Sequence, residues 1–367
     1  MSNTIDILGD SIAAAQILDR TISGAFVDDQ ITKIGRNALN YCTGLTEVSF
    51  PAVSSISTNA LYGCSNIVTA FFPSVTTLDT TAFTLCSNIQ NLTLGLSSMP
   101  SASFFSTFKS IKMLSMDSVT DIPSNAFTSN TTIESVHFST ATIINLQAFR
   151  SCTSLKTVYA PNVTTLGSGA FSTCTALTNL TMPNLSSTGS YAFFSCPLAE
   201  VSFSNMSIIA PDTFMYCASL ISATFENATQ VQYGAFDSCI SLTSISCPNV
   251  VAIYGNAFNR CSSLESVVFP KALFVESWAF SGCINLNRVE LPETSRIASW
   301  AFSSCTQLTT IILGINRSIV CKLDHSNAFT ATPASLKIYV PSSLYDSYIS
   351  ASNWSLISSK LASYTNE

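Results

Sequence analysis

The sequence predicts an α/β repeat solenoid, and three observations support this fold class. An Ala-Phe pair, or a close variant of it, recurs from positions 38–39 to positions 328–329. Successive pairs lie 22 residues apart, except for one step of 21 before 213–214 and one of 27 before 328–329. Hydrophobic residues make up 47% of the chain, yet none of their runs reaches the roughly 18–20 residues that span a bilayer. A fixed period in the twenties is the signature of stacked repeats that share one long core.

Residues 1–30 break the period, and we expect them to form an N-terminal cap or an attachment segment. The first coil of a solenoid exposes an apolar edge that must be covered, which favours a cap. Attachment to a larger assembly is the alternative. The segment has no basic region followed by a long apolar stretch, so it does not resemble a secretory signal.

Each repeat is expected to contain a strand, a second extended stretch and a helical turn. Positions 46–51 (TEVSFP) alternate polar and apolar residues and end at proline, which predicts a strand with Val48 and Phe50 inward. The step from Val53 to Ile56 predicts a turn and a second extended stretch. The A-F-x-x-C-x-x-L segment then has apolar residues three apart, which predicts one turn of helix on the convex side.

Eleven of the thirteen cysteines lie three residues after the Phe position of a repeat. Stacking would place their thiols about 4.8 Å apart, whereas a disulfide needs Cβ atoms about 3.8 Å apart. The chain has no CxxC pair with a nearby histidine, as a zinc site would require. We therefore expect a column of buried, reduced thiols. Its members are Cys42, Cys64, Cys86, Cys152, Cys174, Cys196, Cys217, Cys239, Cys261, Cys283 and Cys305.

The repeat array is expected over residues 31–341, as about 14 copies of the 22-residue unit. An insertion at 314–327 interrupts the last step of the array and contains Cys321 and His325. Residues 342–367 carry apolar side chains at mixed steps of three, four and five residues. This spacing predicts a C-terminal capping helix and a tail.

The pattern I-x-x-x-A-F-x-x-C-x-x-L-x-x-V-x-F-P resembles the BspA-like, or Treponema-type, leucine-rich repeat over roughly residues 31–341. The resemblance implies a right-handed array with a parallel β-sheet on its concave face. It also implies a surface protein that binds other proteins or host cells, and it brings no catalytic residues. Many members carry a signal peptide and an anchor, and we expect no segment of this sequence to serve as either. A phage- or prophage-encoded member needs neither, so a virion or extracellular surface is the expected location and the cytoplasm the alternative.

The sequence predicts a protein that is not an enzyme and that holds no cofactor or metal. Its two histidines, His137 and His325, adjoin no hydrolase or metalloprotease motif, and no phosphate-binding glycine loop is present. A net charge of −6 argues against a nucleic-acid partner. No segment is suited to membrane insertion. An enzyme built on the 314–327 insertion is the remaining alternative to a binding module.

Binding is expected at the outward positions of the strands, where most side chains are small and hydroxylic. The less uniform residues on and beside these strands define the candidate surface: Phe71, Lys112, Met113, His137, Lys156 and Tyr159. Exposed aromatic and methionine side chains on a rigid sheet are typical binding anchors, although Thr and Tyr also suit strands for structural reasons alone. The expected partner is a protein or host-surface ligand, with a glycan as an alternative. A homo-oligomer or larger assembly is left open, as is a cytoplasmic or host-directed scaffold.

Overall fold

The computed structural model describes residues 11–12, 22–105 and 108–364, and it shows a parallel-strand solenoid of about 15 turns. Unit 1 comprises the described residues up to Val163 together with Thr175–Met182. Unit 2 comprises Thr164–Cys174 and the described residues from Pro183 onward. Within each unit, parallel pairing between equivalent strands of successive coils confirms the repeat solenoid predicted from the sequence.

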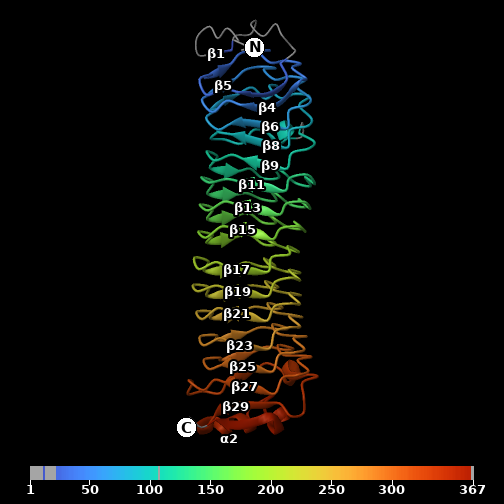
Figure 1. Ribbon diagram of the computed structural model, residues 1–367. Helices are drawn as coiled ribbons and strands as arrows, with labels where there is room; N and C mark the ends of the chain where they lie inside the picture. The colour runs from blue at the N-terminus through green and yellow to red at the C-terminus, as the bar shows by residue number, and fades with distance from the viewer. Residues whose placement is uncertain (1–10, 13–21, 106–107, 365–367) are drawn as a thin grey trace. The chain divides into compact units, whose positions relative to one another are not determined.

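Unit 1 contains an eight-stranded main sheet and a second set of two-residue strands (Figure 1). The main sheet has the strands β2 (Gly24–Val27), β4 (Leu45–Ser49), β6 (Thr69–Phe72), β8 (Asn91–Leu94), β9 (Met113–Ser115), β11 (Ser135–His137), β13 (Thr157–Tyr159) and β15 (Asn179–Thr181). The shorter strands are β1 (Ser11–Ile12), β3 (Lys33–Ile34), β5 (Ser55–Ile56), β7 (Thr77–Leu78), β10 (Asp121–Ile122) and β12 (Ile143–Ile144). Most coils therefore contribute to two ladders, whereas no short strand lies between β8 and β9 in the described residues.

Unit 2 repeats this plan with a three-stranded and a five-stranded main sheet. The three-stranded sheet has β17 (Glu200–Ser202), β19 (Ser222–Thr224) and β21 (Ser244–Ser246). The five-stranded sheet has β23 (Ser266–Val268), β25 (Arg288–Leu291), β27 (Thr310–Leu313), β29 (Lys337–Pro341) and β30 (Leu361–Tyr364). The shorter strands are β14 (Thr165–Leu166), β16 (Ser187–Thr188), β18 (Ile208–Ile209), β20 (Gln230–Val231), β22 (Ala252–Ile253), β24 (Phe274–Val275), β26 (Arg296–Ile297) and β28 (Lys322–Leu323).

The core consists of columns of equivalent residues from successive coils. Val48 and Phe50 are fully buried, which confirms the inward direction predicted for them. In unit 2 the phenylalanines of the Ala-Phe pairs stack face to face; the ring centroids of Phe236 and Phe258 lie 5.3 Å apart with an interplanar angle of 1°. Each coil leaves an apolar edge that the next coil covers, so stability arises mainly from burial between neighbours.

The helical turn expected in each A-F-x-x-C segment is not supported. Asn37, just before the first such segment, and Tyr41, within it, have left-handed backbone conformations with φ of 60° and 56°, which a right-handed helix does not tolerate. Alternate amides bond outward to the next coil: the amide of Leu39 donates to the carbonyl of Ala60 at 2.7 Å. The amides between them bond within the coil, as Cys42 does to Leu39. The segments are thus turns that form a third backbone ladder. Hydrogen bonds within each turn join residues three apart, which is the same three-residue period that predicted a helix.

Helices are few among the described residues. Two lie at Ala-Phe positions, α1 (Ala102–Phe105) and η1 (Ser326–Phe329). Near the C-terminus the chain forms η2 (Ser342–Leu344), α2 (Tyr345–Ser350) and η3 (Ser355–Lys360) before β30. No helix in the part of the chain that is described has the length and apolar character needed to cross a membrane.

All thirteen cysteines are buried and free, which confirms the column of reduced thiols. The structure adds a role that the sequence did not indicate. The thiol of Cys64 donates to the carbonyl of Leu39 in the preceding coil at 2.9 Å, and that of Cys261 donates to the carbonyl of Phe236 at 3.2 Å. Burial raises the pKa of Cys152 and of Cys217 to about 12, so these thiols stay protonated and unreactive.

The segment expected to seal the array, residues 342–367, packs two large aromatic side chains into the core of unit 2. Tyr348 and Trp354 are almost wholly buried, and the ring of Trp354 lies 6.1 Å from that of Phe329 at the end of the aromatic column. The indole of Trp354 donates to the carbonyl of Cys321 at 2.7 Å, and the hydroxyl of Tyr348 accepts from the amide of Cys321 at 2.9 Å. The insertion that contains Cys321 is thereby attached to the C-terminal segment.

The N-terminal segment of residues 1–30 falls only partly within the structure, since 1–10 and 13–21 lie outside the described residues. Within it, β2 already pairs in parallel with β4. The role of this segment as a cap or an attachment stays a prediction.

Candidate binding surface

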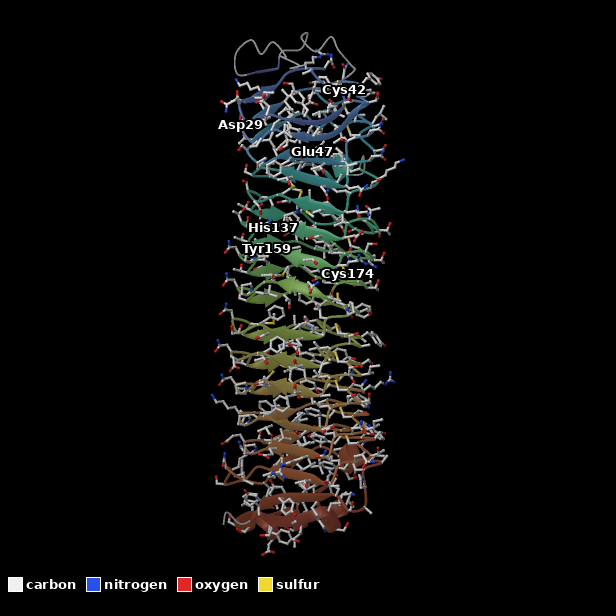
Figure 2. The ribbon with its side chains drawn as sticks, viewed as in Figure 1. Asp29, Cys42, Glu47, His137, Tyr159 and Cys174 are labelled. Atoms are coloured by element: carbon white, nitrogen blue, oxygen red, sulfur yellow. The ribbon has the colours of Figure 1, made fainter. Side chains whose placement is uncertain are left out.

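The candidate surface lies along the main sheet of unit 1, and the parallel register sets which of its residues are neighbours. His137 on β11 is aligned with Tyr159 on β13 and with Ser115 on β9. Met113 starts β9 and is aligned with Ser135. Side chains two residues apart along a strand share one face, so these rows present a regular outward surface. Figure 2 labels His137 and Tyr159 on neighbouring strands.

His137 and Tyr159 form an aromatic pair. Their ring centroids lie 4.4 Å apart at an interplanar angle of 50°, and Tyr159 is 40% exposed. Nδ1 of His137 lies 3.4 Å from Oδ1 of Asp117. Aromatic pairs of this kind contribute about 0.5–1.5 kcal/mol beyond the area they bury. The two rings are therefore held in place before any partner arrives.

A hydrogen-bond network fixes Asp117 beside the histidine. Its carboxylate accepts from the amide and hydroxyl of Ser139, at 3.1 and 2.5 Å, and from the hydroxyl of Ser115 at 2.9 Å. Partial burial raises the pKa of Asp117, but the hydrogen bonds from Ser139 and Ser115 and the charge of His137 outweigh it, so the net pKa is lowered. Asp117 is consequently a fixed negative group that orients His137.

Lys112, Glu134 and Lys156 occupy the position just before the strand in three successive coils. Nζ of Lys156 lies 2.6 Å from Oε2 of Glu134, and Nζ of Lys112 lies 3.8 Å from Oε1. The hydrogen bond and charge of Lys156, together with the charge of Lys112, lower the pKa of Glu134. One carboxylate thus lies between two ammonium groups where β9, β11 and β13 begin, so this row of three side chains carries an excess of one positive charge.

The structure brings these residues together unequally. Met113 is 50% exposed on the strand next to His137. Phe71, which is 37% exposed, is aligned with Thr93 and through it with Ser115. It therefore lies three strand spacings from His137, about 14 Å at the usual separation of strands. We refer to the five residues on or just before the neighbouring strands β9, β11 and β13 as the patch, namely Lys112, Met113, His137, Lys156 and Tyr159. Phe71 lies outside the patch on the same sheet.

Sequence reasoning missed two residues beside this patch, Asp117 and Glu134. Glu134 lies 22 residues after Lys112 and 22 before Lys156, so the repeat period alone places it between them. Asp117 lies 22 residues before Ser139. Comparing the charged residues at every repeat position, rather than only those in strands, would have found both.

Among residues 11–12, 22–105 and 108–364, no group of three or more His, Cys, Asp or Glu side chains is arranged to hold a metal ion. The patch together with Asp117 and Glu134 combines an aromatic pair, a thioether, two ammonium groups and two carboxylates. These groups suit non-covalent recognition, since none of them is an activated nucleophile.

A family model for the BspA type leucine rich repeat region (6 copies) matches residues 21–134, 142–264 and 229–355. Among curated proteins, no relative matches the sequence. A solved leucine-rich repeat protein from Bacteroides ovatus has 19% identity and a TM-score of 0.54, covering 91% of this chain and 88% of its own. A leucine rich cell surface protein from Faecalibacterium prausnitzii has 22% identity, a TM-score of 0.38 and coverage of 82% of both chains. The pneumococcal vaccine antigen PcpA has 16% identity and a TM-score of 0.46, covering 93% of this chain and 87% of its own.

Proposed function

Because this chain belongs to the BspA-type leucine-rich repeat family, we propose that it is a non-enzymatic recognition module that binds another protein. The patch around His137 and Tyr159 on the main sheet of unit 1 is the binding surface. The observation that carries this proposal is the aromatic pair itself: two outward rings 4.4 Å apart, one oriented by Asp117. Leucine-rich repeat proteins are typically protein-binding and surface-associated.

The composition of the patch supports a protein partner. Aromatic anchors surrounded by polar and charged groups are the usual make-up of binding hot spots. From Phe71 to Tyr159 the sheet spans four strand spacings, about 19 Å. That breadth suits one side of a standard interface of roughly 800 Å² per partner. Lys112 and Lys156 would then face an acidic group of the partner.

We place the protein at an exposed surface, as an adhesion protein of a cell or as a component of a virion. The right-handed winding and the concave position of the main sheet, which the family resemblance implies, belong to this proposal. On such a surface the sheet would be presented outward to a host ligand.

The binding role is tested by recovering a partner on the immobilised chain and titrating it against variants. Replacing Phe71 and Tyr159 together by alanine is expected to weaken affinity about tenfold or more, because hot-spot anchors typically contribute over 1–2 kcal/mol each. The matched control is Thr224→Ala with Ser246→Ala, which alters outward positions of the unit 2 sheet. Unchanged affinity in the first variant, or an equal loss in the control, would remove the patch as the binding surface.

A further inference from the structure

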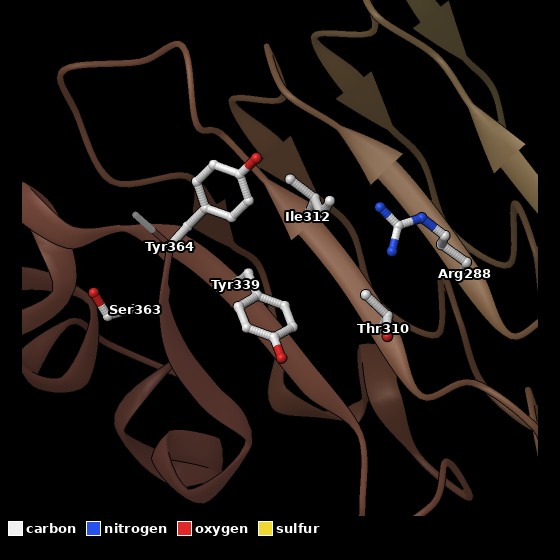
Figure 3. A pocket seen from close by; sticks show the side chains of 6 residues that line it. All are labelled: Arg288, Thr310, Ile312, Tyr339, Ser363 and Tyr364. Carbon is white, nitrogen blue, oxygen red and sulfur yellow. The ribbon is translucent and has the colours of Figure 1, made fainter. Parts of the chain in front are cut away.

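A pocket of about 370 Å³ opens over the last four strands of the five-stranded sheet in unit 2 (Figure 3). It is lined by side chains from β25, β27, β29 and β30, namely Arg288, Thr310, Ile312, Tyr339, Ser363 and Tyr364. Small-molecule pockets have volumes from about 300 Å³ upward. The space therefore suits a ligand of the size of one ring with its substituents.

The lining of the pocket is mainly polar, and Ile312 with the tyrosine rings supplies its apolar part. Ile312 occupies an outward position of its strand, aligned with Tyr339, yet it is only 8% exposed because its neighbours cover it. Tyr339 and Tyr364 are half-buried, and Figure 3 shows Arg288 across Ile312 and Thr310 from them. A tyrosine offers an apolar ring face together with a hydroxyl at its tip. This combination suits a ligand that is apolar on one face and hydroxylated at its edges.

The polar groups of the pocket are available and nearly neutral in sum. Nε and Nη2 of Arg288 both donate to Oε1 of Glu290, each at 2.9 Å. This pairing balances the guanidinium charge and leaves Nη1 without a hydrogen bond to another described residue. Within the described part of the chain, the hydroxyls of Thr310, Tyr339 and Tyr364 also bond no other residue.

Hydroxyl groups both donate and accept hydrogen bonds, and so do the hydroxyls of a sugar. A carboxylate ligand, by contrast, would meet the negative charge of Glu290 beside the arginine. We propose that this pocket binds an uncharged sugar residue of a glycan, whose C–H face packs on Tyr339 and whose hydroxyls reach Arg288 and Thr310. This second site is separate from the protein-binding patch of unit 1.

The test uses the full chain and saturation-transfer NMR with the methyl glycosides of glucose, galactose, mannose and N-acetylglucosamine. Methyl glucuronide serves as the charged counterpart. Saturation transfer to at least one neutral glycoside is expected, and Tyr339→Ala is expected to reduce it at least fivefold. Tyr339→Phe keeps the ring face and is expected to retain more than half of the signal.

Thr310→Val preserves the shape of the strand residue and removes only its hydroxyl, so it tests the pocket even where Tyr339→Ala disturbs the sheet; a loss of at least threefold is expected. Tyr233→Ala, in a turn of unit 2 outside the pocket, is the matched control and should leave the signal unchanged. Absence of transfer to every neutral glycoside, stronger transfer to the glucuronide, or equal effects of Tyr339→Ala and Tyr233→Ala would overturn the proposal.

Discussion

The main sheets of the two units share one inward pattern and differ in what they present outward. The inward residues Val136 in unit 1 and Val201 in unit 2 occupy the same repeat position, and both are buried. The outward positions of β11 and β13 include His137 and Tyr159, whereas those of β19 include only Ser222 and Thr224. Stacking constrains every inward residue but leaves the outward ones free. The repeat therefore specifies the inward residues, whereas the outward residues vary and are the ones that a partner can contact.

The aromatic columns differ in a second way. In unit 2 the rings stack in parallel, as Phe258 and Phe280 do at 5.2 Å and 9°. In unit 1 the column is interrupted where Phe104 and Phe108 meet edge to face at 5.2 Å and 76°. Phe108 lies where most copies have cysteine, and the extra volume is accommodated by rotated rings. Cores accept such exchanges when the total volume is filled.

The largest expected effect is the slow chemical labelling of the inward cysteine thiols in the native chain. Burial raises the pKa of Cys86, Cys152 and Cys217 to about 12. An ordinary thiol has a pKa near 8.5, so the reactive thiolate of these residues is scarcer by about a thousandfold. Labelling of the native chain at pH 8 should be slower by at least that factor than labelling of the denatured chain. The denatured chain should titrate close to 13 thiols; rapid native labelling of most of them would contradict a buried column.

A smaller effect is expected when one ring is removed from the parallel stack of unit 2. Phe258 is fully buried between Phe236 and Phe280. Phe258→Ala should lower the free energy of unfolding by about 3–5 kcal/mol, the usual cost of a large cavity in a core. Urea denaturation followed by circular dichroism measures this change.

The matched outward variant is Tyr159→Ala in unit 1. Its ring is 40% exposed and contacts His137, so the lost ring pair should cost about 0.5–1.5 kcal/mol beyond the area it buries, and no closed cavity is left. Equal destabilisation by Phe258→Ala and Tyr159→Ala would contradict the claim that inward residues contribute more to the free energy of unfolding than outward ones.

The smallest effect concerns the polar network around Asp117. Burial raises its pKa, but the hydrogen bonds of Ser139 and Ser115 lower it below the ordinary value overall. A lowered folded-state pKa contributes stability above about pH 4, the unfolded value, and this contribution is lost as the pH falls through the folded value. Asp117→Asn should therefore destabilise the chain by about 0.5 kcal/mol at pH 7, a figure reduced for solvent screening because the side chain is 45% exposed.

The difference between Asp117→Asn and the original chain should shrink toward pH 3, as measured by urea midpoints at each pH. A difference that stays constant with pH would show that the charge of Asp117 contributes nothing to the network.

Much of the fold was predictable because the same pattern of inward apolar residues recurs in successive repeats. The burial of Val48, Phe50 and the cysteine column follows directly from position within the 22-residue period. The turn ladder was not predictable. Bulky residues such as Tyr41 and Trp278 adopt the left-handed conformation there, and such residues give no local sign of a positive φ.

For the candidate surface, the outward direction of the side chains was predictable, but the contacts among them were not. Alternation along β11 and β13 places His137 and Tyr159 outward, yet their contact and the orientation of His137 by Asp117 depend on side-chain rotamers. The pocket of unit 2 was missed for a different reason. Tyr364 belongs to β30, which pairs with β29, and the spacing of apolar residues in this segment indicates only a helix and a tail.

The central claim is that the outward face around His137 contacts the partner, and the two histidines of the chain allow a direct test. Both are accessible: the side chain of His137 is 43% exposed, and His325 is exposed in the insertion of unit 2. Modification by diethyl pyrocarbonate, followed peptide by peptide in mass spectrometry, should slow at least fivefold at His137 when the partner is bound and stay unchanged at His325. Equal rates at His137 with and without a saturating partner would contradict the account.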